Sequence, residues 1–279
     1  MATPKFSSHA RSISLPSSSH PLLVTVEAHI QRLKSSEAAS STSQLLACQK
    51  LDGLKNLYEC LDDVLQLPLS QQALSNEDVL DGSLMLLDIC GAVRDIYSQM
   101  KETVQELESS LRRKRNGDLA NEVSSYMISR KHLNKMISKC YKDLKKAVKN
   151  CNLEAVNKEA EKLPLVNLIK EVQEVTLSVL ESTLSLVSPF KAGSQPKGWS
   201  LVSKLLQHRT PSSEGHSNIA AMERIEIELH LINKNKSNKD VVKELEALDS
   251  SIQELAEMLE IVFRLLLKTR VSLLNILNH

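Results

Sequence analysis

Glycine and aromatic residues are scarce in this sequence. Glycine occurs 7 times in 279 residues, and the three aromatic types together make up 3%. A β-sandwich or β-barrel needs many tight turns and many aromatic or β-branched residues. A doubly wound α/β domain needs glycine where its strands turn into helices. The composition therefore argues against both classes, and a leucine-rich, glycine-poor chain favours helices instead.

The sequence also lacks an excess of charge of either sign. It holds 35 lysines and arginines against 34 acidic residues, which gives a net charge of +1. A general nucleic-acid binder is strongly basic. We therefore expect no nucleic-acid partner.

Cysteine is present in an odd number, and no two cysteines have the CxxC spacing of a metal or redox site. A chain without a secretory signal keeps its thiols reduced inside the cell. We expect free thiols and a cytoplasmic protein, peripheral at membranes in the alternative discussed below. The five residues are Cys48, Cys60, Cys90, Cys140 and Cys151.

No long uncharged apolar run is present. The two most apolar windows, 165–190 and 258–277, each contain four charged residues, which a membrane-spanning helix does not tolerate. The N-terminal segment is rich in serine and has no acidic residue before Glu27. This composition favours a disordered tail over residues 1–20, and an organellar (plastid) transit peptide is the less favoured alternative.

Proline positions divide the chain, because proline breaks a helix internally. Six of the eight prolines lie either within the first 21 residues or in a Ser/Pro/Gly-rich linker at 188–217. We predict one helical domain over 21–279, interrupted by this linker, with a kink at Pro164. The predicted helices are 21–34, 44–67, 76–115, 118–150, 153–187, 219–233 and 238–278.

Heptad patterns run along the predicted helices. Apolar residues three and four positions apart form a narrow stripe that must be covered by another helix. We expect an all-α, elongated antiparallel helical bundle, with an intermolecular coiled coil as the alternative. The two clearest stripes are Leu86, Cys90, Val93, Tyr97, Met100, Val104, Leu107 and Leu111, and Leu245, Leu248, Ile252, Leu255, Leu259, Val262, Leu266, Thr269, Leu273 and Ile276.

Lysines recur on one side of the helix predicted over 118–150. A solvated face explains such a pattern, and so does pairing with the acidic helix 76–115. Anionic lipid headgroups or an acidic protein are the functional alternatives. These lysines are separated by three or four positions: Lys131, Lys135, Lys139, Lys142, Lys146 and Lys149.

A second candidate site lies in the tail, where Arg11 precedes Ser14 by three residues and Pro16 follows it by two. This pattern is typical of a kinase site that 14-3-3 proteins bind once the serine is phosphorylated. Short patterns of this kind also arise by chance in a serine-rich tail, so the motif makes a 14-3-3 protein one candidate among protein partners that the sequence does not identify.

A third candidate is a short apolar run inside the polar linker. It docks either onto the bundle of its own chain or onto a partner. Its residues include Trp199, Leu201, Val202 and Leu205.

Catalytic motifs are not found in the sequence. It contains no HExxH, GxSxG, Walker or GxGxxG pattern, and its eight histidines are scattered. We predict a protein that is not an enzyme, with no catalytic residue, no cofactor and no metal.

Four segments carry a resemblance to a known family. The tail HARSISLPSSSHP (9–21), the run WSLVSKL (199–205), and the C-terminal segments LEALDSSIQEL (245–255) and KTRVSLLNIL (268–277) resemble the plant Bypass-type proteins. The resemblance implies a helical plant protein whose namesake acts in root and shoot development by restraining a mobile root-derived signal. No catalytic residues are established for the family, so the resemblance assigns none to this chain.

The sequence thus leads to a functional hypothesis. We expect a non-enzymatic plant regulatory or scaffold protein of the Bypass type, active in root and shoot development through protein–protein contacts. The alternative is a peripheral membrane protein that binds anionic lipid through the lysines.

Overall fold

Long helices make up the structure. A computed structural model of the chain describes residues 20–37, 43–68, 70, 77–113, 120–156, 164–188, 225, 229 and 238–278. No strand occurs in these residues, so the predicted all-α class is confirmed. The helices are α1 (Pro21–Glu37), α2 (Gln44–Leu65), α4 (Glu77–Arg113), α5 (Ala120–Val156), α6 (Pro164–Ser185) and α9 (Asn238–Leu277).

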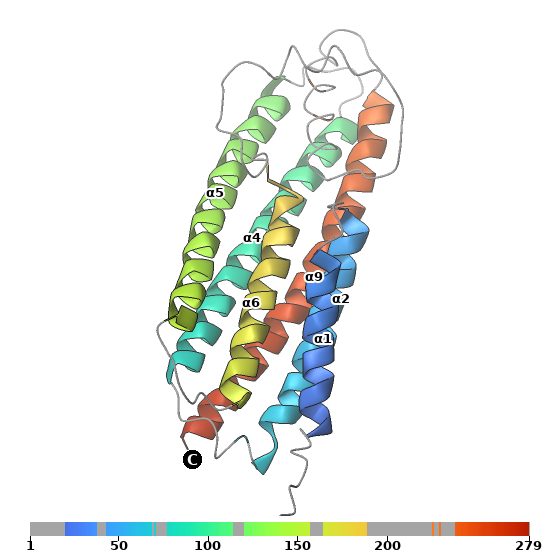
Figure 1. The fold of residues 1–279 in the computed structure, drawn as a ribbon. Helices are drawn as coiled ribbons and strands as arrows, with labels where there is room; N and C mark the ends of the chain where they lie inside the picture. Colours follow the sequence, from blue (N-terminus) through green and yellow to red (C-terminus); the bar gives the residue numbers. More distant parts are fainter. Residues whose placement is uncertain are drawn as a thin grey trace, which may run out of the picture.

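The helices form two layers of three. α6 lies between α1 and α5 in one layer, and α9 lies between α2 and α4 in the other (Figure 1). Successive helices run in opposite directions along the long axis of the bundle (Figure 1). The predicted elongated antiparallel bundle is therefore confirmed.

The two heptad stripes lie on α4 and α9, which are neighbours in one layer. Every residue of both stripes is buried, including Thr269, the single polar member. α4 and α9 make the most extensive helix–helix contact in the described part of the chain. Because a 40-residue helix is about 60 Å long, this contact extends along much of the bundle. The stripes are thus covered within one chain.

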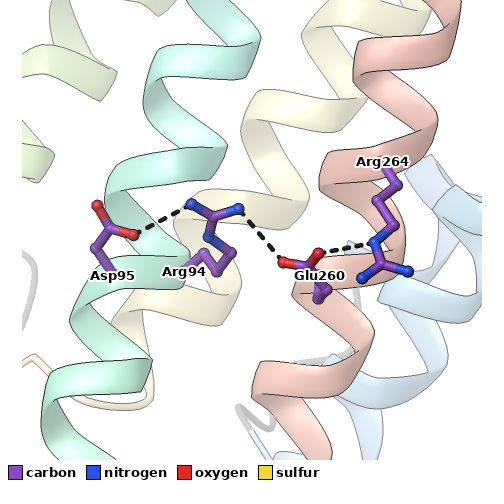
Figure 2. A network of polar contacts seen from close by, with 4 residues as sticks. All are labelled: Arg94, Asp95, Glu260 and Arg264. Carbon is purple, nitrogen blue, oxygen red and sulfur yellow. Dashed lines mark hydrogen bonds and ion pairs between the residues drawn. The ribbon is translucent and has the colours of Figure 1, made fainter.

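An arginine on α4 links it to α9 on the outside of the bundle. Arg94 Nη1 lies 3.3 Å from Glu260 Oε2, and its Nη2 lies 3.4 Å from Asp95 Oδ1. Arg264 Nε donates to Glu260 Oε1 at 2.7 Å (Figure 2). The Arg94 guanidinium also lies 4.2 Å from the centre of the Phe263 ring. These contacts fix the register of α4 against α9.

The region around Pro164 differs from the prediction of one kinked helix over 153–187. Residues 153–156 continue α5, whereas Pro164 is the first residue of α6. α5 and α6 run in opposite directions (Figure 1), so they are separate helices and the prediction of a kink is wrong. The physical reason is that proline at the first helical position gives up no hydrogen bond.

Several predicted features lie outside the described residues. They are the tail 1–19 and most of the linker, from residue 189 onward. Of the helix predicted over 219–233, the structure describes Ile225 and Leu229, which are helical and buried.

Candidate interaction face

The predicted lysines lie on α5, an edge helix. α5 packs mainly against α4 and α6 (Figure 1). Its inward side is formed by Leu133, Ile137, Cys140 and Leu144, all buried. The opposite side of the helix therefore points away from the bundle.

All six lysines of the stripe are exposed, and we call them the lysine face. They are Lys131, Lys135, Lys139, Lys142, Lys146 and Lys149, with exposed Lys145 beside them. The 18-residue separation of the outer two corresponds to about 27 Å along the helix. Within the described part of the chain, no ion pair joins any of them to an acidic residue of α4. The structure thus gives no support to the alternative of internal pairing.

The lysine face reflects a separation of charge between helices. α5 contains eight basic and three acidic residues, whereas the other five described helices together contain 14 basic and 24 acidic residues. α5 is the one described helix with a net positive charge. The described helices thus form a basic edge on an acidic body, and the residues outside these helices bring the net charge of the chain to +1.

A hollow lies in the middle of the lysine face. It has a volume of about 390 Å³ and is lined by Asn134, Lys135, Ser138, Lys139 and Lys142. Three ammonium groups, an amide and a hydroxyl are donors that suit an anionic oxygen. The walls of the hollow are mainly the apolar parts of these side chains, so it is an open depression that the three lysines border.

Sequence reasoning missed an apolar residue at the head of this face. Ile128 is 69% exposed and precedes Lys131 by three positions. It therefore continues the line of the lysines by one helical turn. The spacing was visible in the sequence, but a lone isoleucine in a helix is ordinarily assigned to the core.

The aromatic residue within the stripe, Tyr141, does not belong to the exposed face. It is half-buried and hydrogen-bonded to Ser188. Burial raises the pKa of Tyr141 to about 12. This tyrosine is held at the edge of the core, and the described outer line consists of lysines and Ile128.

The other two predicted sites cannot be placed. The tail motif of Arg11, Ser14 and Pro16 lies outside the described residues. So does the apolar run of Trp199, Leu201, Val202 and Leu205.

A second hollow, of about 490 Å³, lies between the C-terminal half of α4 and the N-terminal half of α5. Its lining is polar and includes Glu102, Glu106, Arg113, Glu122 and several serines. Among the described residues, no group of three or more His, Cys, Asp or Glu side chains is arranged to hold a metal ion.

The buried thiols are not activated nucleophiles. Burial raises the pKa of Cys90 to about 12 and that of Cys140 to about 11. A thiol attacks as the thiolate. Both groups are therefore protonated, and unreactive as nucleophiles, near neutral pH.

The fold and the surface of the described residues define a class of protein, namely a helical bundle with a basic face on one edge helix. None of its described helices is long and apolar enough to cross a bilayer. A family model described as Protein BPS1 matches residues 50–276, and the chain belongs to this plant family, as the resemblance implied. The match extends from α2 to α9 and includes the lysine face. Comparison with curated proteins and with solved structures gave no match.

Proposed function

We propose that this chain is a non-enzymatic regulatory scaffold of plant root and shoot development, which acts through protein–protein contacts in the cytoplasm. The observation that supports this function is the lysine face on α5. It lies within the residues matched by the family model. An exposed, one-signed surface on a rigid helix is suited to holding an oppositely charged partner.

Repulsion between lysines within α5 also supports the binding of an acidic partner. Lys131 and Lys135, Lys135 and Lys139, and Lys142 and Lys146 are neighbours at i,i+4. Each such like-charge pair destabilises a helix by about 0.2–0.5 kcal/mol. An acidic surface bound to α5 relieves this repulsion, so a partner stabilises the helix that it contacts.

Two further contacts complete the proposal. Phosphorylated Ser14, with Arg11 and Pro16, provides a binding site for a 14-3-3 protein. The apolar run beginning at Trp199 provides a second docking segment, on the bundle or on a partner.

Proximity labelling in root tissue tests the scaffold function. The chain is fused to a labelling enzyme and compared with the variant Lys135→Glu, Lys139→Glu, Lys142→Glu. The matched control, Arg32→Glu, Lys55→Glu, Lys243→Glu, makes the same change in net charge on α1, α2 and α9.

We expect a set of labelled proteins that is lost from the lysine-face variant and retained by the control. Identical sets from both variants would contradict a contact through the lysine face. A Ser14→Ala variant that still binds a 14-3-3 protein as the wild type does would remove the tail motif from the proposal.

Anionic lipid is the second candidate occupant of the lysine face. The observation that favours it is Ile128, because an exposed apolar side chain in line with lysines suits the boundary between headgroups and acyl chains.

A further inference from the structure

We propose that the lysine face, with Ile128 at its head, is a docking surface for an anionic lipid bilayer. This inference rests on the proposed function in one respect: it takes the lysine face as the contact surface of the scaffold, and it assigns a bilayer rather than a protein as the occupant of that face. It adds that the scaffold is held at a membrane with α5 toward the lipid and the other helices away from it.

The shape of the face suits a plane. From Ile128 to Lys149 the line follows one helix for 21 residues, or about 32 Å. α5 is an edge helix, so nothing else in the described bundle stands in front of this line (Figure 1). A flat bilayer can contact the whole line at once.

The type of basic residue also favours lipid. Every exposed basic residue of the line is a lysine, a mobile and strongly hydrated point charge. The one arginine of α5, Arg130, is buried and donates to Asn134 Oδ1 at 3.0 Å. Arginine is the residue that fixes a planar partner by two parallel hydrogen bonds, whereas lysines respond to the diffuse negative potential of a bilayer.

The hollow between Lys135, Lys139 and Lys142 gives one headgroup a defined position. The apolar stems of the lysines form most of its walls. Their ammonium groups can reach a headgroup phosphate at its rim, and the amide of Asn134 and the hydroxyl of Ser138 supply further donors. A single phosphate can thus be bound within a contact that otherwise depends on charge alone.

Charge separation sets the orientation. The other described helices carry ten more acidic than basic residues, so an anionic surface repels them and attracts α5. Ile128, 69% exposed, then meets the boundary of the acyl chains. Electrostatics and the apolar residue therefore select the same edge of the bundle.

Co-sedimentation of the full chain with vesicles tests this proposal. Vesicles of phosphatidylcholine alone are compared with vesicles that also contain phosphatidylserine. We expect binding to the second kind only, weakened by salt because surface charges are screened. Soluble glycerophosphoserine should not compete, since it offers the headgroup without the surface.

Two charge variants distinguish an effect of the lysine face from an effect of the net charge of the protein. Lys135→Gln, Lys139→Gln, Lys142→Gln should lower the partition coefficient on the order of a hundredfold, since each lysine near an anionic surface contributes roughly fivefold. The control Arg32→Gln, Lys55→Gln, Lys243→Gln should bind as the wild type does. Equal weakening of both variants would overturn the proposal.

A second pair of variants tests the apolar contact without changing charge. Ile128→Ser should lower binding about tenfold, while Leu45→Ser, at a position that is 68% exposed on α2, should not. Equal effects of the two changes would overturn the role of Ile128. Failure of the wild type to bind anionic vesicles would overturn the membrane proposal, and proximity labelling would still decide the scaffold function.

Discussion

Tyr97 on α4 donates a hydrogen bond of 2.8 Å to the main-chain carbonyl of Thr183 on α6. This carbonyl belongs to the last turn of α6, where carbonyl groups lack the usual helical N–H partner four residues further along the chain. The N–H of Leu186 also reaches it, at 3.2 Å. A buried tyrosine of one helix therefore helps to cap the C-terminus of its neighbour in the other layer.

Removal of this hydroxyl tests the cap. Tyr97→Phe should lower the free energy of unfolding by about 1 kcal/mol, the usual net contribution of one hydrogen bond. The effect stays moderate because Leu186 still donates to the carbonyl. Urea denaturation monitored by circular dichroism measures it, and a variant as stable as the wild type would show that the cap contributes nothing.

Two glycines of α4 provide a matched pair. A Cβ on Gly82 would clash with the side-chain amide of the buried Gln173, whose Nε2 donates to the Val79 carbonyl at 3.2 Å. A Cβ on Gly91 would find its nearest neighbour, Phe263 Cε2, at 3.6 Å, which is an ordinary contact.

The two Gly→Ala changes should therefore have opposite signs. Gly82→Ala forces Gln173 away from Val79 and should destabilise the fold by about 1–3 kcal/mol. Gly91→Ala meets no obstacle and should stabilise it by about 0.5–1 kcal/mol, because alanine is the better helix former. Thermal unfolding of both variants measures the difference, and shifts of the same sign would contradict the close approach of Gln173.

Alkaline pH should destabilise the bundle. Burial raises the pKa of Cys90 from 9.0 to about 12 and that of Cys140 from 9.0 to about 11. Above about pH 9 the unfolded chain releases protons that the folded chain retains, so the free energy of unfolding falls as the pH rises toward these values. Below pH 9 both states hold the thiol protons, and the contribution is fully present.

A series of urea titrations from neutral to alkaline pH measures this fall. The variant Cys90→Ala, Cys140→Ala should show a shallower decline relative to its own value at neutral pH. If the free energy of unfolding of this variant falls with pH as steeply as that of the wild type, the loss of stability at alkaline pH comes from other groups. One such group is the buried Tyr58, whose pKa is also raised by burial.

The arrangement of the core was predictable to a large extent. The stripe from Leu86 to Leu111 and the stripe from Leu245 to Ile276 are buried without exception. The burial of such a stripe can be predicted without knowing which helix covers it, because any apolar helix surface with this spacing must be covered. The lysine face was predictable for the same reason, because a spacing of three and four places side chains on one side of a helix.

The polar interior was not predictable. Tyr58 OH lies 2.8 Å from Thr176 Oγ1, a hydroxyl that itself donates to the Val172 carbonyl. These partners are 118 residues apart in the chain, and no local pattern links them. The prediction of a kink at Pro164 was wrong for another reason. Proline can either kink a helix or begin one, and the sequence around Pro164 does not distinguish the two.

The sequence by itself determined that this protein is helical, where the long helices lie, and which side of each is apolar or basic. Periodicity is a local property, so it can be read without a fold. Only the tertiary structure decided that α5 lies at the edge, that its lysines find no acidic partner on α4 within the described chain, and that Ile128 stands exposed in line with them. These facts depend on how the helices are arranged in two layers, because the same stripe is a buried contact or an open face according to what packs against it.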